Sequence, residues 1–207
     1  MMDTSGPLSC LLAMEGGRSL TTPTGVAGRR IPESVRGLSL RIIDVGSGPG
    51  FPGIPLKIVC PRLKLTLLEA TGKKVTFLQH IVGLLRLKDV HVIHERAEET
   101  GQSPENRETY DVVLARAVAD LSILAEYTLP LCRLGGWVIA QKGAEAQAEV
   151  MGAERAITIL GGKLRQMIDV ELSGLAEARS LVIIDKTART PANYPRRPGI
   201  PHKKPLH

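Results

Sequence analysis

The stretch Asp44-Val45-Gly46-Ser47-Gly48-Pro49-Gly50 is the most informative part of this 207-residue chain. It continues the apolar run at residues 40–45, and an apolar run that ends in a glycine cluster is typical of a buried parallel strand followed by a tight turn. Glycine adopts backbone angles that other residues avoid and lets a ligand approach the main chain closely. We therefore expect a ligand to lie against this turn, in contact with Gly46 and Gly48.

Strand and helix patterns alternate along the chain that follows the glycine turn. Apolar residues recur at helical spacing over 75–85, Asp120 can cap a second helix, and short apolar runs typical of strands occupy residues 63–68, 90–93, 110–115 and 137–140. This alternation indicates βαβ units, and therefore an α/β fold with a Rossmann-like, doubly wound, mostly parallel sheet. Ligands of such sheets bind at the carboxyl ends of the strands.

Two further strands are expected near the end of the chain. Residues 166–172 and 181–185 are joined by a link that is too short for a helical crossover, so they predict a C-terminal antiparallel hairpin. The composition then divides the chain into a weakly structured segment at 1–38, a folded domain at 39–186 and a basic, Pro-rich tail at 187–207. Five prolines and no acidic residues in that tail are typical of disorder.

The bulk composition limits the possible partners. A formal net charge of +6 favours a polyanion such as nucleic acid, while an aromatic content of only 3% argues against a base-stacking platform. Cys10, Cys60 and Cys132 lie far apart without metal-ligand spacing, so we expect reduced thiols and no metal. No apolar run approaches the ~20 residues that span a bilayer. We expect a cytoplasmic monomer without a membrane partner.

The residues after the glycine turn indicate which nucleotide binds there. A dinucleotide fingerprint requires glycine where this chain has Phe51, and Pro52 follows where the next helix should offer amides to a pyrophosphate. A nucleotide without phosphates, such as S-adenosyl-L-methionine, fits better. Glu69 lies 19 residues past Gly50 at the end of the second strand, where a carboxylate can accept hydrogen bonds from ribose hydroxyls. The fold and these residues together predict an S-adenosylmethionine-dependent methyltransferase domain.

Three further strand ends carry candidate site residues. Ala97 and Glu98 follow the third strand, where a backbone amide and a carboxylate can receive the adenine ring, although a charged run after a strand is more often a solvated turn. Arg116 ends the fourth strand and Lys142 ends the fifth. Each can face the cofactor or pair with an RNA phosphate, and the alternative for each is an ordinary ion pair at a strand end.

These motifs resemble the bacterial small-subunit (16S) ribosomal RNA guanine-N7 methyltransferase G family, also called glucose-inhibited division protein B. The resemblance rests on order and spacing from about residue 40 to 186. It is carried by the stretches at 44–56, 68–70, 73–74, 77–78, 96–99, 115–117 and 141–143, and the tail at 194–199 is similar to the endings of some members. Members ordinarily begin with a longer helical segment, so residues 1–38 look truncated relative to the family.

The resemblance implies methylation of guanine N7 in 16S rRNA or the small ribosomal subunit, with S-adenosyl-L-methionine as the methyl donor. It implies cofactor contacts at Gly46, Phe51, Ala97-Glu98 and Arg116, with Glu69 on the ribose. Guanine N7 already carries an exposed lone pair, so orientation of the reactants can supply most of the catalysis. We nominate no catalytic residue, and assign Arg116 and Lys142 to positioning RNA.

Two other classes of function stay open at this point. A noncatalytic RNA- or ribosome-binding module on a methyltransferase scaffold would also explain the short N-terminal segment and the basic tail. A small-molecule methyltransferase or a nicotinamide enzyme is disfavoured by Phe51 and by the positive charge. Cofactor binding separates the first of these alternatives from an enzyme, and turnover without RNA identifies the second.

Overall fold

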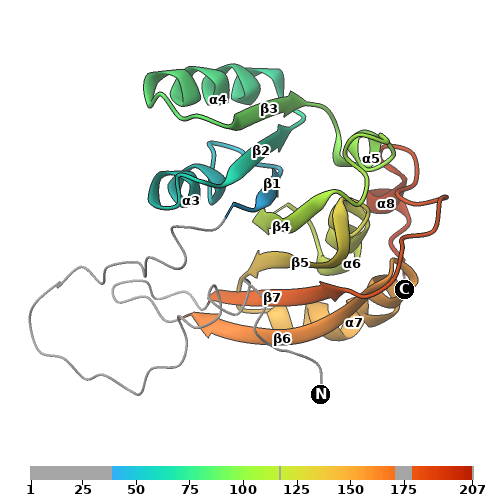
Figure 1. Ribbon diagram of the computed structural model, residues 1–207. Coiled ribbons are helices and arrows are strands. Elements are labelled where there is room, and N and C mark those ends of the chain that lie inside the picture. The colour runs from blue at the N-terminus through green and yellow to red at the C-terminus, as the bar shows by residue number, and fades with distance from the viewer. Residues whose placement is uncertain (1–38, 117, 171–178, 207) are drawn as a thin grey trace, which may run out of the picture.

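The computed structural model describes residues 39–116, 118–170 and 179–206, and the segment at 1–38 lies outside these ranges. A seven-stranded sheet has the order β3-β2-β1-β4-β5-β7-β6 (Figure 1). Its strands are β1 (Arg41–Val45), β2 (Lys64–Glu69), β3 (Val90–His94), β4 (Tyr110–Arg116), β5 (Cys132–Lys142), β6 (Gly162–Val170) and β7 (Arg179–Lys186). β1 to β5 pair in parallel, whereas β7 is antiparallel to β5 and to β6. The doubly wound sheet and the C-terminal hairpin are therefore confirmed.

Helices cover both faces of the sheet. One face packs against α3 (Gly53–Val59) and α4 (Gly72–Leu84), and the other against α6 (Leu121–Thr128) and α7 (Ala146–Ile159). The short helices α5 (Ala97–Thr100) and α8 (Ile200–Lys203) lie beside α6 (Figure 1). Side chains of successive strand residues point to opposite faces, so Ile43 and Val45 enter the α6/α7 core while Ile42 enters the α3/α4 core.

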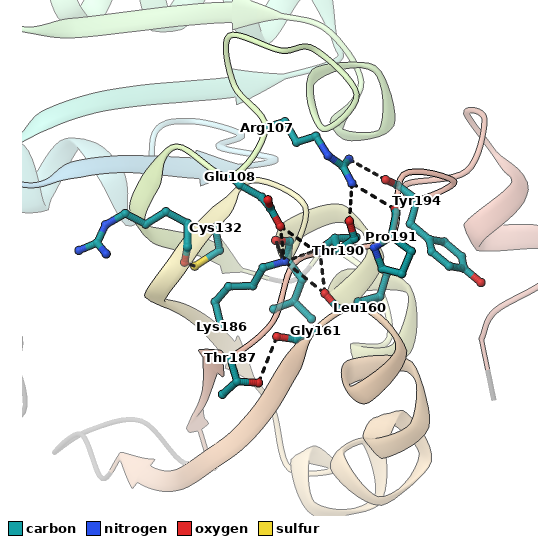
Figure 2. Close-up of polar contacts among 12 residues, drawn as sticks. Arg107, Glu108, Cys132, Leu160, Gly161, Lys186, Thr187, Thr190, Pro191 and Tyr194 are labelled. Atoms are coloured by element: carbon teal, nitrogen blue, oxygen red, sulfur yellow. Dashed lines mark hydrogen bonds and ion pairs between the residues drawn. The ribbon is translucent and has the colours of Figure 1, made fainter. Parts of the chain in front are cut away.

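The expectation of a disordered C-terminal tail was wrong. The Arg107 guanidinium donates hydrogen bonds to the backbone carbonyls of Thr190 (2.8 Å), Pro191 (3.1 Å) and Tyr194 (2.7 Å), as Figure 2 shows. At the start of this segment the Lys186 ammonium, buried at 1% exposure, forms an ion pair with Glu108 at 3.2 Å. Because these partners lie some 80 positions away in sequence, the local composition carries no sign of them.

Candidate functional site

The glycine turn after β1 has the backbone that its composition predicts. Gly46, Gly48 and Gly50 have φ values of +68°, +57° and +95°, a region that disfavours other L-residues. A Cβ atom at Gly46 would lie 2.8 Å from Val118 Cγ2, so a side chain there would displace a neighbour as well as strain the backbone. The turn therefore keeps its main chain open toward the carboxyl ends of the strands.

Glu69 fixes this turn from the end of β2. One carboxylate oxygen accepts the Gly48 N–H at 2.9 Å, and the other accepts the Thr71 N–H at the same distance. Burial raises the pKa of Glu69, but the hydrogen bonds from Thr71 and Gly48 and the nearby Lys74 outweigh it, so the pKa is lowered. The side chain is thus an anion at neutral pH, and each oxygen retains a lone pair for a further donor.

Asp44 lies beneath the same turn, fully buried at the end of β1. Its Oδ2 accepts the Gly53 N–H at 2.9 Å, so the first amide of α3 is already used. Its Oδ1 is buried without a hydrogen-bond partner among the described residues. Burial raises the pKa of Asp44 to about 6, against the opposing effects of the Gly53 hydrogen bond and the charge of Arg116. Asp44 therefore fixes the start of α3 beneath the glycine turn and carries a buried oxygen that is left without a partner in the described part of the chain.

A cavity of about 370 Å³ opens at the carboxyl ends of β1 to β4. Its wall brings together five of the predicted cofactor residues, Gly46, Glu69, Ala97, Glu98 and Arg116. The two others, Gly48 and Phe51, are not in the wall. The Gly48 N–H donates a hydrogen bond to Glu69. The Phe51 ring is half-exposed, and the Arg116 guanidinium lies over it at 5.6 Å from the ring centroid.

A second cavity of about 400 Å³ adjoins the first, because Arg116 and Val118 line both. Lys142 lies in its wall, but its ammonium forms an ion pair with Glu149 at 2.6 Å and donates to the Ala119 carbonyl. Glu149 in turn accepts the Leu121 N–H at 2.8 Å, at the start of α6. The geometry thus favours an indirect role for Lys142, which holds α6 and α7 in place beside the cavity.

The structure adds residues to the site that sequence reasoning did not nominate. Tyr127 and Lys74 line the first cavity, and Asp120, Gln141 and Arg179 line the second. Tyr127 lies on α6, and burial together with the charges of Glu98 and Glu126 raises its pKa to about 12. Lys74 and Gln141 belong to the stretches 73–74 and 141–143 that carry the family resemblance. No local motif marks Tyr127, Asp120 or Arg179 as site residues, because they reach the cavities from elements that are adjacent only in the fold.

Within the described ranges, no three His, Cys, Asp or Glu side chains gather where they could hold a metal ion. None of the described helices is long and apolar enough to cross a membrane.

Solved structures that resemble this sheet define its class. A SAM-dependent methyltransferase from Aquifex aeolicus is similar over 70% of this chain and 82% of its own, with a TM-score of 0.55 and 14% identity. Precorrin-6y C5,15-methyltransferase from Geobacter metallireducens is similar over 72% and 80%, with a TM-score of 0.53 and 13% identity. The fold is that of the class I S-adenosylmethionine-dependent methyltransferases.

Sequence comparison then gives the family. The profile of the family described as rRNA small subunit methyltransferase G matches residues 28–181. Proteins named ribosomal RNA small subunit methyltransferase G are 55% identical in Roseiflexus castenholzii, over 80% of this chain and 70% of that protein, and 47% identical in Roseiflexus sp. (strain RS-1), over 91% and 83%. The chain belongs to the rRNA small subunit methyltransferase G family, and S-adenosylmethionine is the cofactor of that family.

Proposed function

We propose that this protein transfers the methyl group of S-adenosylmethionine to N7 of a guanine in 16S rRNA. The observation that carries the proposal is the pair of joined cavities at the carboxyl ends of the strands. One is built on the glycine turn and Glu69, and the other opens between β4, β5 and α6, with Arg116 in the wall of both. Two reactants can therefore lie side by side on one protein surface.

The first cavity fits the cofactor. Gly46 lines this cavity without a side chain, and a Cβ atom there would lie 2.8 Å from Val118, another residue of the wall. Glu69 can accept the ribose hydroxyls, and Ala97 with Glu98 can receive the adenine. When bound, the cofactor supplies an electrophilic methyl group on a sulfonium. The cavity wall is balanced in charge, with Lys74, Arg96 and Arg116 against Glu69, Glu95 and Glu98.

The second cavity offers groups that complement guanine. Asp120 can accept hydrogen bonds from the base's N–H groups, and Arg116 and Gln141 can donate to its oxygen. No proton has to leave N7 before it reacts, so these residues need only hold the base in line and exclude water, which contributes up to ~7–11 kcal/mol in well-aligned systems. Lys142 positions the wall through Glu149.

The cellular location and the oligomeric state can be proposed from the substrate and from the site. An enzyme of ribosomal RNA works where ribosomes are assembled, which for a bacterial protein is the cytoplasm. Both cavities are lined by residues of one chain, so one copy can supply the whole site. We therefore propose a cytoplasmic monomer, and light scattering on the purified protein measures its mass directly.

Calorimetric titration with S-adenosylmethionine tests the cofactor site. The wild type is expected to bind, and Gly46→Arg is expected to abolish binding because the new side chain fills the cavity. Gly152→Arg is the matched control, since nothing lies within 4 Å of a Cβ built at that position on α7. The control should bind like the wild type, and replacing a helical glycine should stabilise it by ~0.5–1 kcal/mol.

Absence of binding by the folded wild type would contradict the enzymatic proposal. The favoured function would then be a noncatalytic module that binds RNA or the ribosome. Equal binding by the wild type and Gly46→Arg would show that the cofactor does not bind at the glycine turn.

A further inference from the structure

The C-terminal strap, defined as residues 187–206, is fixed to the body of the molecule at both ends. Its first part is held by Arg107 and by the buried network around Lys186, where Glu108 also accepts the Thr190 N–H at 2.8 Å (Figure 2). Its far part is held by Arg196, whose guanidinium forms a 2.6 Å ion pair with the buried carboxylate of Glu126 on α6. The strap therefore has a defined course over α5 and α6 (Figure 1).

The strap also contacts the wall of the cofactor cavity. The Gly199 N–H donates to Glu98 Oε1 at 2.9 Å, and Glu98 lines that cavity. Glu126, the partner of Arg196, immediately precedes Tyr127, which lines the same cavity. The outer surface of the strap's far part, around Gly199, consequently lies beside the place where the proposed reaction occurs.

Three acids that contact the strap or its first residue are engaged in holding it. Glu98 bonds to the strap backbone, Glu108 pairs with Lys186, and Glu126 pairs with Arg196. The strap itself contains no acidic residue. Three cations in its far part are exposed, and none of them forms an ion pair with a described residue: Arg197, Lys203 and Lys204. Arg189 is exposed as well, but β7 is antiparallel to β5, so Arg189 follows the end of β7 that lies away from the cofactor cavity.

We propose that these three cations, Arg197, Lys203 and Lys204, form a fixed docking surface for the phosphate backbone of rRNA next to the cofactor cavity. The proposal rests on the function proposed above, because it takes RNA as the substrate. Each phosphate that a Lys or Arg neutralises releases condensed counterions, which gives affinity and steep salt dependence. Cations on a fixed strap lose less conformational entropy on binding than cations on a disordered tail, so each contact contributes more.

Charge-neutralising variants test the surface. The strap variant is Arg197→Gln/Lys203→Gln/Lys204→Gln. The control variant, Arg62→Gln/Lys64→Gln/Lys88→Gln, removes the same charge from exposed residues at the amino ends of β2 and β3, the opposite edge of the sheet. Affinity for a 16S rRNA transcript is measured by fluorescence anisotropy from low to high salt. Calorimetry with S-adenosylmethionine on the same preparations reports whether each variant keeps the cofactor site.

The strap variant is expected to bind the transcript about ten- to a hundredfold more weakly, with the slope of log K against log salt reduced by ~2–3. The control should lose less than about threefold, and both should bind the cofactor like the wild type. An equal loss in both variants, or no loss in either, would overturn the proposal. So would a strap variant that loses affinity for poly-glutamate but not for rRNA, since the surface would then serve an acidic protein.

A charge-preserving variant tests whether the strap must be fixed. Arg196→Lys keeps the net charge and the three outer cations but lacks the planar fork that holds Glu126. We expect the transcript to bind several-fold more weakly, and an unchanged affinity would overturn the claim of a fixed surface. Strap-dependent RNA binding by a wild type that does not bind S-adenosylmethionine would support the docking surface while refuting the proposed methyl transfer.

Discussion

The side chain of Glu69 has two roles: it holds the glycine turn and it faces the proposed cofactor site. Its oxygens hold the Gly48 and Thr71 amides, and the same carboxylate faces the cavity in which we place the cofactor ribose. Sequence spacing identifies Glu69 as a ribose acceptor but not as the group that fixes the glycine turn. That second task depends on a hydrogen bond across 21 positions of the chain.

Glu69→Gln is expected to weaken S-adenosylmethionine binding about ten- to a hundredfold. An amide oxygen can replace only one of the two carboxylate oxygens, so one backbone N–H faces an NH₂ group and the charged acceptor for the ribose is lost; hydrogen bonds to charged groups contribute ~1.5–3 kcal/mol. Calorimetry measures the affinity. Glu105→Gln, an exposed carboxylate away from both cavities, is the control and should bind normally. An unchanged affinity in Glu69→Gln would show that Glu69 does not bind the cofactor.

Asp44 gives the fold a pH dependence of predictable sign. Its pKa is raised from about 4 in the unfolded chain to about 6, so its contribution to stability is fully present below pH ~4 and is lost as the pH rises through about 6. Asn at this position still accepts the Gly53 N–H but cannot ionise. The free energy of unfolding of the wild type, relative to Asp44→Asn, should therefore fall by roughly 3 kcal/mol between pH 4 and pH 7.

Urea unfolding of both proteins across this pH range measures the difference. Parallel stability curves would show that Asp44 does not titrate in this window.

At the scale of elements, the structure depends on contacts between segments that are distant in sequence. The strap follows β7, yet it is held by α5, α6 and the segment before β4. Arg196 is the clearest anchor, because it meets a Glu126 carboxylate whose side chain is only 1% exposed. Removing one partner of a buried pair leaves the other charge uncompensated, which is the costly case for an ion pair.

Arg196→Ala is expected to lower the free energy of unfolding by about 2–4 kcal/mol. Arg133→Ala is the matched control. The Arg133–Asp111 pair is equally short at 2.6 Å, but its arginine side chain is 44% exposed, so we expect a loss of at most about 1 kcal/mol. Denaturant unfolding compares the two variants. Equal losses would mean that the strap contributes no more than an ordinary surface ion pair.

Two helices, α3 and α7, were not predicted from the local sequence pattern. α7 escaped prediction because three of its buried residues are Ala146, Ala153 and Ala156, whose small side chains contrast weakly with their neighbours. α3 escaped it because Pro55 lies in its first turn, where proline is tolerated although it usually signals a break. Both helices become evident only when the sheet that they cover is known.

For the molecule as a whole, the sequence predicts those features that follow from local patterns of apolar residues and glycines. The alternation of apolar runs predicts the doubly wound sheet and the C-terminal hairpin, and the glycine turn with Glu69 predicts where a ligand binds. The sequence could not predict that Tyr127 joins the cavity or that Gly199 bonds to Glu98, because the latter contact spans 101 positions. Arg196 looks solvated in the sequence, and only the fold shows that it pairs with Glu126.

The most direct test of the central claim is product analysis after methyl transfer. Wild-type protein is incubated with isotope-labelled S-adenosylmethionine and with small ribosomal subunits or 16S rRNA that lack the modification, and the RNA is digested for mass spectrometry of its nucleosides. We predict labelled 7-methylguanosine from the wild type and none from Gly46→Arg. No label in RNA from a wild type that binds the cofactor, or label on another atom or base, would contradict the claim.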